Sequence, residues 1–450
     1  MIPIPSHAQT ALTVLEQNGY DAYLVGGCVR DSLLGDTPSD YDITTNATPQ
    51  QVLAAFLAYH TVETGLQHGT VTVVIDSVPV EVTTFRIDGD YHDNRRPDCV
   101  TFTGNLRDDL ARRDFTVNAM AYRPSTGLVD CFGGQQDLRA RLIRCVGVPD
   151  IRFGEDALRI LRALRFASVL GFTIEPETAK SIHKNKTLLT HIAAERIQAE
   201  FFKLLCGINP APLLDEYRDV LAVFLPEITA MFGFAQHTKY HDSDVWHHSL
   251  RALASIEAHS LPLRLAAFLH DIGKPACFTM DEGGVGHFYG HAKQSVELAR
   301  NLLNRLKCDN ATKHAVLTLI EYHDAELAST KKSVKRWLGR LGPELFFDLL
   351  RLQAADSMAH AAPYVAPRLH ALGQIRTLAQ EVLDEGACFS LRDLAVNGRD
   401  MITLGLEGRQ IGAALDYLLT LVIDGAAENE KTVLLHAARG WIEETNTSNT

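Results

Sequence analysis

The sequence predicts an α+β fold, with a small head built on a mixed or antiparallel sheet and a mostly helical body after it. The head is predicted from β-branched and alternating runs, which are AYLV, TVTVVI and VPVEVTTF within residues 20–145. Helical patterns at VRDSLL and PQQVLAAFLAY separate these strands. After Pro149 strand signals nearly vanish and long helical periodicity follows, as in EDALRILRALRFASVL. The expected order is therefore a sheet-bearing head and then helices.

Changes in composition and in hydrophobic periodicity divide the 450 residues into four expected parts. The head covers residues 1–146, and a helical neck covers 147–232. Proline and glycine near 207–233, followed by the histidine-rich HTKYHDSDVWHHSL, open a third, helical part at 233–362. A helical tail fills 363–450, and its polar end ETNTSNT is expected to be disordered.

The composition excludes several classes of protein. No apolar run reaches the ~18 to 20 residues that cross a bilayer, and the start MIPIPSHAQTAL is unlike a signal peptide. We therefore expect a cytoplasmic chain with no membrane contact. The eight cysteines are scattered, which predicts reduced thiols rather than a disulfide scaffold or a zinc site. A formal charge of −12 argues against a wholly basic surface but leaves room for a local basic stripe.

Acidic side chains in the head predict a magnesium site. In PSDYDIT, Asp40 and Asp42 are two residues apart, so on a strand they would emerge from the same face. Glu81, on the non-valine face of VPVEVTTF, is a candidate third carboxylate. A few carboxylates together with substrate phosphates are the ligands that Mg²⁺ prefers. An isolated Asp-x-Asp is more often a solvated turn, so this prediction depends on its neighbours.

The preceding segment YLVGGCVRDSLLG reads as a strand, a Gly26-Gly27 turn and a helix. Such a turn presents unpaired backbone N–H groups and a helix N-terminus, which together can bind a triphosphate. Arg30 could add a charge-assisted contact to a phosphate. A purely structural turn is the alternative.

These two motifs together resemble the signature of the DNA polymerase β-like nucleotidyltransferase superfamily, and more narrowly its tRNA nucleotidyltransferase and bacterial poly(A) polymerase branch. Further matching motifs follow in order, namely DGDYHDNRRP, RRDFTVNAM, DCFGGQQDL, EDALRILRALRF and AAERI. The resemblance implies that Asp40 and Asp42 bind the metals. It also implies that Arg113 and Asp114 contact phosphate and ribose, and that Asn118 supports the nucleotide.

The EDALR motif predicts base recognition. Asp156 and Arg159 are i and i+3, so on one helix they project from nearly the same side. A carboxylate and a guanidinium match the amino group and ring nitrogen that cytosine and adenine share, and they oppose uracil and guanine. Arg162, on the same expected face, would hold Asp156 or touch the nucleotide. The alternative is an intrahelical ion pair worth only ~0.2 to 0.5 kcal/mol.

A second set of motifs, WHHSL, AAFLHDIGK, GHFYGHA, EYHD and AADSMAH, resembles the metal-dependent HD phosphohydrolase domain. The resemblance implies that His248, His270, Asp271 and Asp356 are the core ligands, with His291 and His323 as additions. Imidazoles with a carboxylate suit a transition metal such as Ni, Co or Mn better than Mg²⁺. The hypothesis is hydrolysis of a phosphoester, for example a 2′,3′-cyclic phosphate on a damaged RNA end. A lone histidine packed in a core is the usual alternative.

By resemblance to the bacterial CCA-adding enzymes, the chain is expected to add C, C and then A to the 3′ end of tRNA from CTP and ATP, without a nucleic-acid template. Two-metal nucleotidyl transfer with Mg²⁺ is the expected chemistry. A poly(A) polymerase or A-adding enzyme remains the alternative, although Ala157 stands where the poly(A) branch often has proline. A regulatory HD phosphohydrolase with a nucleotide-binding head is the third hypothesis. The polar segment Asp88–Pro97 is expected to be a mobile loop, and a homodimer is left open.

Overall fold

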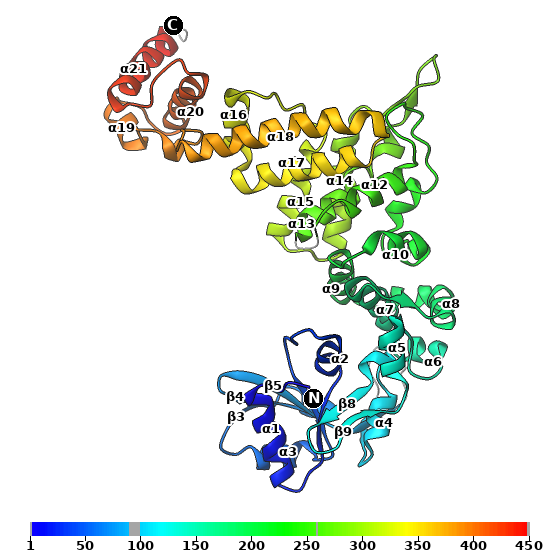
Figure 1. The fold of residues 1–450 in the computed structure, drawn as a ribbon. Coiled ribbons are helices and arrows are strands. Elements are labelled where there is room, and N and C mark those ends of the chain that lie inside the picture. Colours follow the sequence, from blue (N-terminus) through cyan, green and yellow to red (C-terminus); the bar gives the residue numbers. More distant parts are fainter. Residues whose placement is uncertain (1, 90–99, 258–259, 448–450) are drawn as a thin grey trace. The chain divides into compact units, whose positions relative to one another are not determined.

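The computed structural model of the chain describes residues 2–89, 100–257 and 260–447. It separates into two compact units, of which the first is Met1–Glu227 with Asn304–Cys308, and the second is Ile228–Leu303 with Asp309–Thr450 (Figure 1). The sheet lies in the first unit and helices dominate the second, so the predicted α+β class is confirmed. Among the described residues, no helix has both the length and the apolar character that a membrane crossing requires.

A seven-stranded mixed sheet with the order β3-β4-β5-β2-β1-β8-β9 forms the head. Strands β2 and β5 are parallel, and their neighbours in the sheet are antiparallel. The strands are β1 Ala22–Val25, β2 Asp42–Thr45, β3 His60–Val62, β4 Thr70–Ile75, β5 Val78–Thr84, β8 Met120–Arg123 and β9 Gly127–Asp130. The three strands expected from the sequence correspond to β1, β4 and β5. Strand β5 alternates between buried and wetter positions as expected.

Five α-helices of the head pack around this sheet: α1 Ser6–Gln17, α2 Gly27–Leu34, α3 Pro49–Ala55, α4 Leu106–Ala111 and α5 Gly134–Ala140. Helices α1 and α3 pack on one another and on the sheet (Figure 1). Helix α3 begins where Thr48 and Gln51 form a capping box, which satisfies two free backbone N–H groups. A separate ribbon pairs β6 Arg86–Asp88 with β7 Val100–Phe102. Most of the predicted loop Asp88–Pro97 lies outside the described residues.

The neck consists of short and medium helices: α6 Pro149–Glu155, α7 Leu158–Leu170, α8 Pro176–Asn185, α9 Ala194–Leu205, α10 Pro210–Glu216 and α11 Arg218–Leu221. Helices α7 and α9 pack together along their length. Gly207, just after α9, permits this contact, because a Cβ atom there would lie 2.0 Å from Ser168 Oγ. One strand does lie after Pro149, because β11 Thr173–Ile174 pairs with β10 Leu142–Ile143.

The second unit opens with a cluster of helices: α12 Val245–Ala254, α13 Leu261–Leu269, α14 His291–Arg305, α15 Asn310–Tyr322, α16 Lys331–Leu341, α17 Pro343–Met358 and α18 Ala362–Asp384. A short hairpin of β12 Thr279–Met280 and β13 Gly286–His287 precedes α14. Helices α12, α13 and α15 pack against α17, which brings residues far apart in the sequence to one place.

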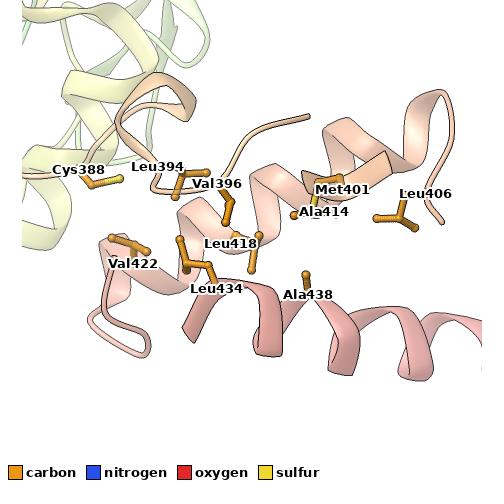
Figure 2. Packing of buried hydrophobic residues seen from close by; sticks show 10 residues of the cluster. All are labelled: Cys388, Leu394, Val396, Met401, Leu406, Ala414, Leu418, Val422, Leu434 and Ala438. Atoms are coloured by element: carbon orange, nitrogen blue, oxygen red, sulfur yellow. The ribbon is translucent and has the colours of Figure 1, made fainter. Parts of the chain in front are cut away.

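The tail consists of α19 Gly398–Thr403, α20 Arg409–Asp424 and α21 Lys431–Thr447, which enclose a small core of their own. Figure 2 shows Leu418 and Leu434 meeting between α20 and α21, and both side chains are fully buried. Helix α21 includes residues 444–447, so the prediction of a disordered end is wrong for them. The helical hydrogen bonds outweigh the polar composition there, and residues 448–450 lie outside the described residues.

Candidate functional site

The carboxylates of the head, which we call the acidic site, are Asp40, Asp42 and Glu81. Strand register sets the position of two of them, because Ile43 lies beside Val82 in the parallel pair β2–β5. Asp42 therefore lies beside Glu81, on the same face of the sheet. Asp40 precedes β2, so the condition under which both aspartates would share one strand face is not met, and Asp40 accepts a hydrogen bond from Ser39 Oγ at 2.7 Å.

Electrostatics nevertheless links all three carboxylates. The pKa of Asp42 is raised to about 6, first because surrounding atoms exclude part of its hydration, and then because Glu81 and Asp40 repel its charge. Arg113 acts in the opposite direction. A group of oxygen ligands that repel one another at the surface is what a hard divalent cation stabilises, so these residues fit Mg²⁺.

The glycine turn lies next to this site, because β1 pairs with β2 so that Val25 lies opposite Asp42. Gly26, the residue just before α2, has a φ of 79°, a conformation that favours glycine. A Cβ atom at Gly26 would lie 3.3 Å from Arg113 Nη1, so the Arg113 guanidinium lies against the turn. The turn, Arg113 and the acidic site thus adjoin one another.

Arg30 lies against the turn, because a Cβ atom at Gly27 would lie 3.7 Å from its Nη2, and its expected phosphate contact stays a prediction. Arg30 is 8% exposed and donates to Asn118 Oδ1 at 2.6 Å, and it pairs with Asp31. Asn118 in turn donates to Asp114 Oδ1 at 3.1 Å. The structure therefore places Arg30 as a support for Asn118 and, through it, for Asp114.

Asp114 is the centre of a polar network that joins head and neck. Arg162 Nε and Nη2 donate to its Oδ2 at 2.9 and 2.6 Å. Burial would raise the pKa of Asp114, but Arg162 and Asn118 lower it to about 2, so the group is an ionised acceptor at neutral pH. Arg162 thus binds Asp114 rather than Asp156, and its other expected role, a contact with the nucleotide, stays a prediction.

The prediction that Asp156 and Arg159 share one helix is wrong. Helix α6 ends at Glu155 and α7 begins at Leu158, and Asp156 between them has an extended backbone with φ −134° and ψ 104°. Its Oδ1 accepts the Leu158 N–H at 3.1 Å. The side chain thus caps α7 instead of continuing the helix, a behaviour typical of aspartate at helix ends.

Different partners hold these two residues in place. Asp156 Oδ2 accepts from Arg196 Nη2 at 3.1 Å, so Arg196 of α9 holds the carboxylate from the other side. Arg159 is 8% exposed and donates to Glu155 Oε2 at 2.5 Å and to the Arg112 carbonyl at 2.9 Å. Glu155 was missed by sequence reasoning, although its i,i+4 spacing to Arg159 is a recognisable ion-pair signal.

The second unit contains what we call the histidine site. Its core is formed by His248, His270, Asp271 and Asp356, whose ligand atoms all lie within 4.8 Å of one another. His248 comes from α12, His270 and Asp271 follow α13, and Asp356 lies on α17. The neighbouring His247 instead contacts Asp244 Oδ1 at 2.7 Å, at the start of α12. His248, and not its neighbour His247, therefore lies in the core of the histidine site.

Backbone contacts orient the imidazoles toward the carboxylates. His248 Nδ1 lies 3.3 Å from the Ala359 carbonyl, and His270 Nδ1 lies 2.9 Å from the Ala267 carbonyl. Each Nε2 faces a carboxylate, and His248 Nε2 lies 2.9 Å from Asp356 Oδ1. His270 Nε2 and Asp271 Oδ1 are buried without a hydrogen-bond partner in the described residues, whereas Asp271 Oδ2 forms an ion pair with Lys274 Nζ at 2.7 Å. Unpaired nitrogen and oxygen atoms converging in a buried place fit a transition metal.

The charges at this site reinforce that fit. Burial would lower the pKa of His270, but Asp271 and Asp356 raise it to about 10. Burial would raise the pKa of Asp271, but His270 and Lys274 hold it well below its usual range. The two carboxylates thus favour a positive charge between them, which a proton or a metal ion can supply.

A cavity of about 420 Å³ opens beside the histidine site. Two cations line it, Lys274 and Arg368, and Lys274 Nζ lies 2.7 Å from Asp271 Oδ2. Sequence reasoning missed both cations, although Lys274 follows the His-Asp pair in LHDIGK at a fixed spacing. A cationic cavity next to a metal site can bind a phosphoester.

Three family models match the chain. They are the Poly A polymerase head domain at residues 22–144, the probable RNA and SrmB-binding site of polymerase A at 171–232, and the HD domain at 245–358. The first covers the acidic site and the third covers the histidine site.

Curated relatives extend the match. The CCA-adding enzyme of Limosilactobacillus reuteri is 50% identical over 210 residues, so the match spans only about half of that relative, 52% of its length. The CCA-adding enzyme of Geobacillus stearothermophilus is 36% identical over 443 residues, covering 96% of this chain and 95% of the relative. That of Pediococcus pentosaceus is 33% identical and covers 96% of both chains.

Solved structures agree in fold. A crystal structure of the Bacillus stearothermophilus CCA-adding enzyme in complex with CTP has a TM-score of 0.73 at 32% identity, covering 99% of this chain and 98% of that one. The Thermotoga maritima CCA-adding enzyme complexed with tRNA has a TM-score of 0.60 at 20% identity, which shows the fold alone. Because more than 30% identity extends over nearly the full length of two curated relatives, the chain belongs to the CCA-adding enzyme family.

Proposed function

We propose that this protein adds C, C and then A to the 3′ end of tRNA from CTP and ATP, without a nucleic-acid template. The observation that carries the proposal is the register of β2 and β5, which puts Asp42 beside Glu81 next to the Gly26 turn. The substrates are those named for relatives, which include a CCA-adding enzyme in complex with CTP and another complexed with tRNA.

In the proposed reaction the tRNA 3′-hydroxyl attacks the α-phosphorus of the nucleotide, and pyrophosphate leaves. Asp40 and Asp42 would hold Mg²⁺, which supplies charge neutralisation at the triphosphate when bound. Glu81 adds negative charge beside them. The backbone N–H groups after Gly26 and the Arg113 guanidinium bind the phosphates and align them for attack.

Nucleotide selection is assigned to the neck. Arg159 is fixed by Glu155 and the Arg112 carbonyl, and Asp156 is held by Arg196. A fixed donor and a fixed acceptor would satisfy cytosine and adenine, whereas uracil and guanine would leave buried polar groups mismatched. Asp114, ionised and held by Arg162, is assigned to the ribose hydroxyls.

For the second unit we propose a metal-dependent phosphohydrolase that uses Ni, Co or Mn. The core ligands are His248, His270, Asp271 and Asp356. Lys274 and Arg368 in the adjoining cavity support a phosphoester substrate, such as a 2′,3′-cyclic phosphate. The four-part division at residues 146, 232 and 362 and a cytoplasmic location are part of the same proposal. The open homodimer prediction is checkable by light scattering.

A single assay tests the main proposal. A tRNA transcript ending at the discriminator base is incubated with the protein, Mg²⁺, CTP and ATP, and products are resolved at single-nucleotide length. Growth by three nucleotides that requires both CTP and ATP is the expected result. A long ladder with ATP alone would establish a poly(A) polymerase, and no extension at all would favour the regulatory phosphohydrolase.

A further inference from the structure

We propose that Asp109 is a positioning residue that holds the Arg113 guanidinium in place for the triphosphate. This inference rests on the phosphate contact proposed for Arg113 and adds the side chain that would orient it. Asp109 lies on α4, four residues before Arg113, and its side chain is fully buried. A buried carboxylate requires partners that compensate for its lost hydration, so the contacts of Asp109 indicate what it holds.

Two arginines share the Asp109 carboxylate, one on each oxygen. Arg112 donates to Oδ1 from Nε at 3.0 Å and from Nη2 at 2.8 Å. Arg113 donates to Oδ2 from Nη2 at 3.3 Å. Burial alone would raise the pKa of Asp109, but the charges of Arg113 and Arg112 lower it below its ordinary value. Asp109 is therefore an ionised acceptor at neutral pH.

The two contacts differ in strength, and this difference leaves the charge of Arg113 available. Arg112 donates two short hydrogen bonds to Asp109, whereas the bond from Arg113 is longer. One carboxylate between two guanidinium groups leaves one positive charge in excess. Because Arg112 satisfies most of the carboxylate, Asp109 can orient Arg113 without cancelling the charge that an anion would meet.

The other nitrogen atoms of the Arg113 guanidinium are available to a phosphate. A Cβ atom at Gly26 would lie 3.3 Å from Arg113 Nη1, so this nitrogen lies against the glycine turn. Arg113 Nε is buried and has no hydrogen-bond partner in the described part of the chain. A buried donor without an acceptor costs free energy, and an oxygen of a phosphate bound at the turn can supply that acceptor. Arg113 is thus held through Nη2 and can donate to a phosphate from the rest of its fork.

Asp109 is itself fixed by two strands. Thr44 Oγ1 donates to Asp109 Oδ2 at 3.1 Å, and Thr44 lies on β2, two residues after Asp42. The Arg86 N–H, at the start of β6, donates to Asp109 Oδ1 at 3.4 Å. Since Arg113 is held by Asp109 and Asp109 is held by β2, the Arg113 guanidinium keeps a set position relative to Asp42. A triphosphate that contacts both Arg113 and a metal held by Asp42 requires such a fixed geometry.

Holding α4 against the sheet is the alternative role for Asp109. This role accounts for the hydrogen bonds from Thr44 and Arg86, because an uncharged acceptor would serve both of them. It does not account for the charge, because an amide would offer the two guanidinium groups a weaker acceptor and an opposing N–H group. The two roles therefore predict different results for Asp109→Asn, which keeps the shape of the side chain and removes its charge.

Equilibrium binding of CTP and of cytidine to the full-length protein, in the presence of Mg²⁺, tests the proposal. Asp109→Asn should weaken CTP binding roughly tenfold, the loss expected for one charge-assisted hydrogen bond. Binding of cytidine, which has no phosphate, should stay within about twofold of wild type. The matched control Asp108→Asn, on the same helix, removes a charge from a carboxylate that accepts from Thr103, and it should bind CTP like wild type. Equal weakening of CTP and cytidine by Asp109→Asn would overturn the proposal in favour of the structural role.

A double variant tests whether Asp109 acts through Arg113. Asp109→Asn combined with Arg113→Met should bind CTP within about twofold of Arg113→Met alone, whereas independent losses that multiply would overturn the proposal.

Arg113→Lys keeps the proposal testable if Asp109→Asn does not fold, because the Arg113 side chain is 20% exposed and lysine keeps the charge without the fork. A loss of CTP affinity of roughly tenfold is expected, since one ammonium group cannot serve both Asp109 and a phosphate. Wild-type affinity in this variant would overturn the positioning role. Unchanged CTP binding in Arg113→Met would overturn the phosphate contact as well, whereas the tRNA extension assay tests the proposed function separately.

Discussion

Arg162 donates two hydrogen bonds to Asp114, from Nε at 2.9 Å and from Nη2 at 2.6 Å, although the two residues are 48 positions apart in the sequence. Asp114 belongs to the segment between α4 and β8 in the head, and Arg162 belongs to α7 in the neck. The charge proposed to receive the ribose is therefore set by a residue of another part of the chain. If Asp114 binds the ribose as proposed, this pair couples nucleotide binding to the packing of the neck.

Replacing Arg162 with methionine should destabilise the first unit. Asp114 would remain buried without its main partner, and breaking a buried ion pair costs ~3 to 5 kcal/mol. Because the Arg162 side chain is 32% exposed, we expect a smaller loss, on the order of 2 to 3 kcal/mol. Urea unfolding measures it. The matched control Arg139→Met, at an exposed position, should change stability by less than about 0.5 kcal/mol.

The magnesium requirement should depend on pH through Asp42. Its pKa of about 6 means that a proton competes with Mg²⁺ below pH 6 and no longer competes well above it. The Mg²⁺ concentration for half-maximal nucleotide addition should therefore be flat above this pH. Below it, the requirement should rise roughly tenfold per pH unit, as expected when one proton is displaced. Initial rates between pH 5 and 8 measure this dependence.

Glu81→Gln removes a negative charge that raises the pKa of Asp42. The pH below which the Mg²⁺ requirement begins to rise should therefore be lower in this variant than in wild type. Glu63→Gln, at an exposed position elsewhere in the head, should leave this pH unchanged. Identical profiles for Glu81→Gln and wild type would remove Glu81 from the acidic site.

Arg196→Ala should weaken discrimination against UTP and GTP. The substitution removes the Arg196 guanidinium that holds Asp156, and the carboxylate then has only its cap to Leu158. We expect roughly a tenfold loss of discrimination, which corresponds to ~1.4 kcal/mol. Single-nucleotide incorporation kinetics with each of the four nucleotides measure it. Lys203→Ala, exposed on the same helix, is the matched control, and equal effects of the two substitutions would refute the role of Arg196.

Removing the metal of the histidine site should leave nucleotide addition intact. Asp356→Asn takes away a core ligand on α17, whereas the acidic site lies in the other unit. The variant should lose phosphohydrolase activity with Ni, Co or Mn and keep CCA addition with Mg²⁺ within about twofold of wild type, a change of ~0.4 kcal/mol. Parallel loss of both activities in a folded variant would show that the two sites are not independent.

Local pattern predicted much of this molecule. The strands β1 and β4 follow from their apolar and β-branched residues, and β5 follows from alternation, which a half-buried strand requires. His248 was named from the resemblance to the HD domain, and it is fully buried. The Gly26 turn was found because a tight strand-to-helix connection needs positive φ.

Contacts that no local pattern encodes were the ones predicted wrongly. The partner of Arg162 is distant in sequence, so periodicity placed Arg162 beside Asp156 instead. The helix break at Asp156 depends on whether an aspartate caps the next turn or continues the helix, and residue type permits both. The orientation of the His291 and His323 rings depends on carbonyls three residues before each, which only the folded backbone reveals.

The break between α6 and α7 has a consequence for how a protein can read two different bases in turn. Arg159 is anchored within α7, whereas Asp156 belongs to neither helix, so its carboxylate can swing by rotation of a few single bonds while both helix axes stay fixed. This rotation would break the hydrogen bond from the Leu158 N–H and the partly exposed ion pair with Arg196. The loss is about 1 to 2 kcal/mol, which is small against the binding energy of a nucleotide. In the proposed recognition pair, Arg159 is thus fixed in position and Asp156 is adjustable.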